Sequence, residues 1–91
     1  MDAQENKILN MIKPTEEPLA EQAAGQISQY IIDQHIESGD KLPNEFELAA
    51  QLNVGRGTIR EAVKILVARN VLQIRRGKGT YVAKHTGVIE D

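Results

Sequence analysis

The 91-residue sequence contains no cysteine, which excludes disulfide bonds and thiolate metal sites. Its two histidines, His35 and His85, are too few and too far apart to form a cluster of metal ligands. We therefore expect neither a metal nor another cofactor in this chain. The lack of cysteine also fits a protein of the reducing cytoplasm.

Aromatic residues are scarce as well. Tryptophan is absent, and the aromatic residues are Tyr30, Phe46 and Tyr81. The core must therefore be aliphatic, built from leucine, isoleucine, valine and alanine. A chain of this length forms one small domain of modest stability.

Long apolar runs are missing from the N-terminus, which reads MDAQENKILNMIK and includes Asp2 and Glu5. A signal peptide needs about 7–15 apolar residues in a row, and a membrane span needs about 20. We predict neither, and we expect a cytoplasmic protein with no membrane partner.

The formal net charge of −2 hides a division of charge along the chain. Residues 1–40 carry eight acidic and two basic side chains, whereas residues 54–84 carry eight basic side chains and one acidic. Two interpretations are open: a solvated surface whose charges happen to segregate, or an electropositive face that binds a polyanion.

The chain divides into an arm, a domain and the start of a linker. Residues 1–17 are predicted to be an arm, in which Ile8, Leu9 and Ile12 could form a short amphipathic helix. A helix of about 20 residues is expected from Pro18 to a C-cap at Gly39. Its apolar stripe consists of Leu19, Ala23, Ile27, Tyr30, Ile31 and Ile36.

Two further helices are predicted with a three-residue turn between them. Asn44 and Glu47 form a capping-box pattern for a helix over residues 45–52, with Leu48, Ala49 and Leu52 inward. Residues 53–55 form the turn. The next helix runs from residue 56 to about residue 69, and its core stripe is Ile59, Ala62, Val63, Leu66 and Val67.

The period then changes from helical to alternating. Asn70 closes the helix, residues 71–74 and 80–83 are predicted strands, and residues 75–79 form the hairpin loop. Lys41 and Leu42 could add one short strand. This order predicts an α+β fold, a winged helix-turn-helix of three helices and a C-terminal β-hairpin wing over residues 18–84.

The start of the third helix has the chemistry of a major-groove reader. With Ile59 and Val63 facing the core, Arg56, Gly57, Thr58 and Arg60 are left around the other side of the helix. Arginine can bind guanine through two parallel hydrogen bonds, and free backbone N–H groups at a helix start suit a phosphate. The alternative is that these arginines are ordinary surface residues paired with glutamates.

The hairpin loop concentrates Arg75, Arg76 and Lys78 around Gly77. Basic residues at a narrow tip suit a minor groove or phosphates, and a charged exposed turn is the alternative. Lys64 and Arg69 are weaker candidates for backbone contacts. The candidate DNA-binding residues are Asn44, Gly55, Arg56, Gly57, Thr58, Arg60, Lys64, Arg75, Arg76, Gly77 and Lys78.

With these residues in place, the sequence resembles the DNA-binding domain of the GntR family of bacterial transcription regulators, from about Leu19 to Val82. The run TIREA and the ending near GVIED are most similar to the FadR-type branch. The matching segments are Gly39–Glu45, Glu47–Ala49, Leu52–Val54, Arg56, Thr58–Ala62 and Gly77–Val82.

The resemblance implies a metabolite-responsive regulator, most often a repressor, that binds a palindromic operator as a dimer. A larger C-terminal domain, absent from this chain, would dimerise and bind a small carboxylic acid. Residues 85–91 would begin the linker to it. We expect no enzymatic activity, because no catalytic arrangement of side chains is present. A protein-binding winged helix without a DNA role remains the alternative.

The resemblance also assigns roles to individual residues. Arg56 and Arg60 match arginines of the recognition helix, Thr58 matches a position that touches DNA, and Gly77 matches the glycine of the wing tip, beside a base-reading position at Arg76. Two departures stand out. Phe46 replaces a DNA-contacting arginine and is expected to pack inward or against another chain, and Gly55 replaces a hydroxyl-bearing cap.

Overall fold

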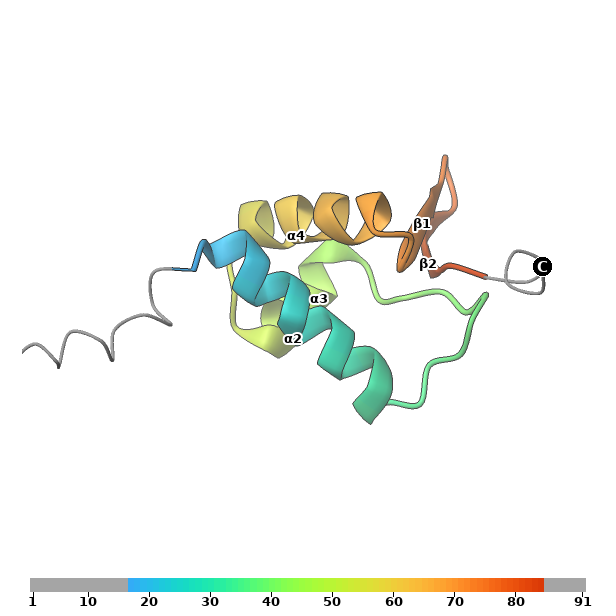
Figure 1. Ribbon diagram of the computed structural model, residues 1–91, viewed down its shortest axis with the longest axis horizontal. Coiled ribbons are helices and arrows are strands. Elements are labelled where there is room, and N and C mark those ends of the chain that lie inside the picture. The colour runs from blue at the N-terminus through green and yellow to red at the C-terminus, as the bar shows by residue number, and fades with distance from the viewer. Residues whose placement is uncertain (1–16, 85–91) are drawn as a thin grey trace, which may run out of the picture.

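The computed structural model describes residues 17–84, which form three helices followed by an antiparallel hairpin (Figure 1). This confirms the predicted winged helix-turn-helix. No helix in this part of the chain is long and apolar enough to cross a membrane. The predicted arm helix and the linker lie outside the described residues. The elements are α2 (Leu19–Asp33), α3 (Glu45–Leu52), α4 (Arg56–Ala68), β1 (Leu72–Arg75) and β2 (Gly79–Val82).

The first helix, α2, is shorter than predicted. Pro18 is its N-cap instead of its first residue, and the helix ends at Asp33, well before Gly39. The chain turns at His35, whose φ of 56° is left-handed, and the N–H of Ile36 donates to the carbonyl of Ile31. This is a Schellman ending. Ile36 fits the predicted apolar stripe because the ending returns it to the core edge, where it is half-buried.

The second helix, α3, has the predicted bounds and the predicted cap. The side-chain oxygen of Asn44 accepts the N–H of Glu47 at 2.9 Å, and the carboxylate of Glu47 accepts the N–H of Asn44 at 2.9 Å. Asn53 ends the helix in the left-handed conformation, with φ 56°. The turn between α3 and α4 is therefore the three residues 53–55, as predicted.

The core is aliphatic, as predicted, and contains no buried aromatic side chain among the described residues. The prediction that Leu19 belongs to the core is wrong, since Leu19 is 67% exposed. It is the first residue of α2 and lies at the edge of the helix packing. Ala24 is buried instead. The buried residues are Ala23, Ala24, Ile27, Leu42, Leu48, Ala49, Ile59, Ala62, Leu66, Leu72 and Ala83.

The hairpin follows α4 directly, beyond its C-terminal end (Figure 1). Asn70 is left-handed, as predicted, with φ 63°, and the N–H of Val71 donates to the carbonyl of Leu66. That bond belongs to the helix ending, so the first strand begins one residue later than predicted. Strand β1 spans residues 72–75 and β2 spans residues 79–82, with Leu72 opposite Val82.

The predicted short strand at Lys41 is an isolated bridge. Lys41 pairs with Tyr81, and the N–H of Leu42 donates to the carbonyl of Thr80 at 2.8 Å. Gly39 lies on the same side of the hairpin, and its N–H donates to the carbonyl of Val82 at 2.8 Å. The segment between α2 and α3 therefore anchors the hairpin to the helices.

The core assignment predicts different costs for one substitution at two places in α2. Ile27 has no exposed surface, and Ile27→Val should lower the free energy of unfolding by about 0.5–1.5 kcal/mol. Ile32→Val removes the same methyl group from a side chain that is 65% exposed, so the change should stay within about 0.5 kcal/mol. Urea unfolding followed by circular dichroism measures both. Equal decreases in the free energy of unfolding for the two variants would contradict the placement of Ile27 in the core.

Candidate nucleic-acid interface

Packing fixes which side of α4 faces solvent. Ile59 and Ala62 have no exposed surface, and they turn that side of the helix into the core. Arg56, Arg60 and Lys64, spaced by four residues, form an exposed stripe along another side. The sequence predicted Arg56, Gly57, Thr58 and Arg60 together on this side, and the two arginines are exposed there as predicted.

Thr58 lies apart from this stripe. It is half-buried and lines a hollow on the α2 side of the helix start, with Leu19, Gln22 and Gly55 among its neighbours. Thr58 therefore lies on the α2 side of the helix start. Thr58 is the one recognition-helix candidate whose side chain is not freely exposed.

Gly55 and Gly57 are not required by the fold. Gly55, the N-cap of α4, has an ordinary φ of −67° and makes no side-chain cap bond. A Cβ built on either glycine would meet no atom within 4 Å. The first backbone N–H groups of a helix also have no partner within the helix. The start of α4 is therefore open, both sterically and in its hydrogen bonds.

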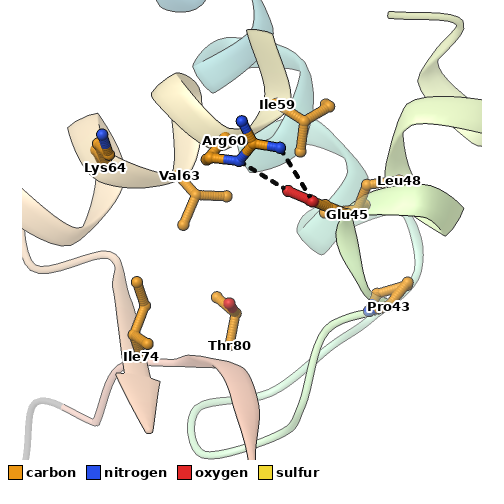
Figure 2. A pocket seen from close by; sticks show the side chains of 9 residues that line it. All are labelled: Pro43, Glu45, Leu48, Ile59, Arg60, Val63, Lys64, Ile74 and Thr80. Carbon is orange, nitrogen blue, oxygen red and sulfur yellow. Dashed lines mark hydrogen bonds and ion pairs between the residues drawn. The ribbon is translucent and has the colours of Figure 1, made fainter. Parts of the chain in front are cut away.

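An ion pair ties the exposed stripe to α3. The Nε and Nη2 atoms of Arg60 donate to the two carboxylate oxygens of Glu45, each at 3.2 Å (Figure 2). The hydrogen bond from Arg60 holds the pKa of Glu45 below its ordinary value and raises the pKa of Arg60 in turn. Both groups are exposed to solvent, so the pair orients Arg60 more than it stabilises the fold.

A groove of about 270 Å³ lies between α4 and the hairpin. Figure 2 shows Val63 on α4 pointing across it toward Ile74 and Thr80, with Arg60 and Glu45 at one end. Its lining is largely apolar, and Lys64 lies at its rim on α4. The groove separates the basic stripe of α4 from the first strand of the hairpin.

Arg56 is held by an aromatic ring. Its guanidinium carbon lies 4.0 Å from the centroid of the Phe46 ring, which is cation–π distance. The Phe46 side chain is 62% exposed, so the expectation that it packs inward is wrong. Leu48 and Ala49 face the core in this short helix, and they leave Phe46 outside.

The hairpin turn presents the other predicted basic residues. The guanidinium of Arg75 lies 4.2 Å from the centroid of the Tyr81 ring, and Arg76 and Lys78 are exposed at the turn. Gly77 has φ +75°, which favours glycine, and the N–H of Lys78 donates to the carbonyl of Arg75 at 2.9 Å. The backbone thus makes the narrow tip that the sequence predicted.

Several candidates have partners within the chain. Lys64 pairs with Glu61 at 3.3 Å, and Arg69 pairs with Glu21 of α2 at 2.8 Å. The side-chain oxygen of Asn44 is engaged in the cap of α3. Within residues 17–84, no carboxylate lies at ion-pair distance from the remaining basic candidates, which are Arg56, Arg75, Arg76 and Lys78.

The aromatic partners of Arg56 and Arg75 were missed by the sequence reasoning. The sequence predicts no contact of Phe46 or Tyr81 with an arginine. A signal existed for Phe46: the capping box sets the start of α3, and the inward Leu48 and Ala49 then place position 46 outside. Nothing in the sequence set the distance from Phe46 to Arg56.

Known proteins with similar sequences and structures are bacterial transcription regulators. The family model described as "Bacterial regulatory proteins, gntR family" matches residues 19–82. The mannosyl-D-glycerate transport/metabolism system repressor MngR of Escherichia coli K12 is 38% identical over 65 residues, which are 71% of this chain and 27% of the repressor. The chain spans about a quarter of the length of the first curated relatives that it matches, 25–27%.

Solved structures show the same fold. A Streptococcus agalactiae GntR structure has a TM-score of 0.72 and 49% identity over 78% of this chain and 35% of that one. The AraR DNA-binding domain in complex with an operator has a TM-score of 0.64 and 39% identity over 72% of this chain and 80% of that domain. By its sequence, its helix-turn-helix and its wing, the chain belongs to the gntR family of bacterial regulatory proteins.

Proposed function

We propose that this chain is the DNA-binding domain of a bacterial transcription regulator, with α4 in the major groove and the hairpin tip in the minor groove. One observation carries the proposal: Arg56 and Arg60 are exposed beside two glycines that leave the helix start open. The operator complex of the AraR domain, which has the same fold at 39% identity, supports it.

Arg60 has the donors that base reading needs even while it is paired. A guanidinium has five N–H donors, and Glu45 accepts from Nε and Nη2. Both hydrogens of Nη1 and one of Nη2 are left, and the two terminal nitrogens of a guanidinium present such hydrogens side by side as a fork. Such a fork fits O6 and N7 of guanine.

The other candidates are proposed for phosphates and the minor groove. The open N–H groups at the start of α4 suit a phosphate, and Thr58 would reach one only on the α2 side. Lys64 is assigned to the DNA backbone, one turn beyond Arg60. Asn44, at the start of α3, and Gly55, at the start of α4, would lie near the DNA backbone. The wing residues are Arg75, Arg76, Gly77 and Lys78.

For the whole protein, we propose a metabolite-responsive repressor that binds a palindromic operator as a homodimer in the bacterial cytoplasm. MngR, among its relatives, is a repressor. A further C-terminal domain would sense a small carboxylic acid, and residues 85–91 would lead to it. We assign no catalytic role and no cofactor to the 91 residues, since the relatives are transcription regulators.

The proposal predicts the effect of Arg60→Ala on a site selected from random DNA by the wild-type chain. Affinity should fall by about 1–3 kcal/mol, and the preference for guanine at one position should relax. Fluorescence anisotropy titrations on the selected site and on its single-base variants measure both. Arg60→Ala binding as tightly and as selectively as wild type would contradict the assignment.

Lys64→Ala is the matched control on the same helix stripe. It should weaken binding to all sequences alike and reduce the slope of log K against log salt by about 0.9, the value for one phosphate contact. Binding by the wild-type chain that does not depend on salt would instead favour a protein-binding winged helix.

The open helix start predicts opposite effects of Gly57→Ala on stability and on DNA binding. An alanine in α4 should stabilise the fold by up to about 1 kcal/mol, because no atom blocks its Cβ. The same methyl group should weaken DNA binding, because it stands where the backbone approaches the DNA. Thermal unfolding and anisotropy titrations measure the two effects.

Gly25→Ala provides the control, since Gly25 lies inside α2 and has equally open surroundings. It should stabilise the fold and leave DNA affinity unchanged. If Gly57→Ala gained stability and also bound DNA as tightly as wild type, the DNA would not approach this part of α4.

A further inference from the structure

The position of Phe46 is not explained by folding. It is the second residue of α3, and its side chain is 62% exposed. The inward side of α3 is already occupied by Leu48 and Ala49, which are buried. The ring therefore contributes little to the core, and its contacts lie at the surface.

The ring lies where α3 and α4 begin. Arg56, the first residue of α4, stacks on it at 4.0 Å. The preceding residue of α3, Glu45, forms the two-bond pair with Arg60, one turn along α4. Two adjacent residues of α3 therefore hold the two exposed arginines of α4, Glu45 by an ion pair and Phe46 by a cation–π contact.

Resting on the proposed function, we propose that Phe46 and Arg56 together read one two-base step. Arg56 would bind guanine, and the exposed part of the Phe46 ring would pack against the 5-methyl group of a neighbouring thymine. Both features lie in the major groove, where guanine presents O6 and N7 and thymine presents its methyl group. An apolar ring fixed beside a guanidinium matches an apolar methyl group fixed beside a guanine.

The test begins with a DNA site selected from random sequence by the 91-residue chain. Each thymine of that site is then replaced in turn by uracil, which removes only the 5-methyl group. One replacement, next to a guanine, should weaken wild-type binding about fourfold. This is the change expected when one methyl group is no longer buried in the complex. Fluorescence anisotropy gives the affinities.

The Phe46 variants separate a methyl contact from a structural role. Phe46→Ala should bind the thymine and uracil sites equally, whereas Phe46→Leu should retain part of the discrimination, because leucine is still apolar. Both variants should unfold at the wild-type temperature, since the ring is exposed. Ile32→Ala removes an equally exposed apolar side chain from the far end of α2 and should discriminate like wild type.

The outcomes distinguish this inference from the proposed function. If the chain selects a site but no uracil replacement weakens wild-type binding more than Phe46→Ala binding, the reading role of Phe46 is wrong and the proposed function stands. If the chain selects no site from random DNA, the proposed function fails and this inference fails with it. A single thymine position whose discrimination disappears in Phe46→Ala supports both.

Discussion

The close packing of α4 against α2 and α3 is the constraint on which the rest of the structure depends. With no aromatic residue in the core, the helices approach one another through small side chains, and Ala23, Ala24, Ala49 and Ala62 are all buried. Ile59 and Ala62 fix the rotation of α4 about its axis. The stripe from Arg56 to Lys64 is thereby turned to solvent, and the position of the proposed recognition surface follows from the core.

The exposed arginines are held in place as well as exposed. Arg60 is bound by Glu45, Arg56 is stacked on Phe46, and Arg75 is stacked on Tyr81. A long side chain that is ordered before binding loses less conformational entropy when it meets DNA. Glu45 leaves three N–H donors of Arg60, and stacking on a ring covers a face of the Arg56 or Arg75 guanidinium and not its N–H groups. In the proposed interface the partners would act on binding through orientation, whereas their direct effect on folding stability is small.

The sequence predicted the parts whose signals are local. The capping box gave the start of α3, and the alternation after Asn70 gave the hairpin to within one residue. The end of α2 was missed because a histidine, His35, takes the left-handed position where a glycine was expected. The stack of Arg56 on Phe46 could not be predicted, since it depends on how two helices cross.

The central claim, that the start of α4 and the hairpin tip form the DNA-binding surface, is tested most directly by nuclear magnetic resonance. Selected operator DNA is titrated into the ¹⁵N-labelled chain, and the amide shifts are followed residue by residue. We expect the largest changes at residues 55–61 and 76–78, with residues 28–33 of α2 unaffected. The largest changes in α2, with Arg56 to Arg60 unchanged, would contradict it.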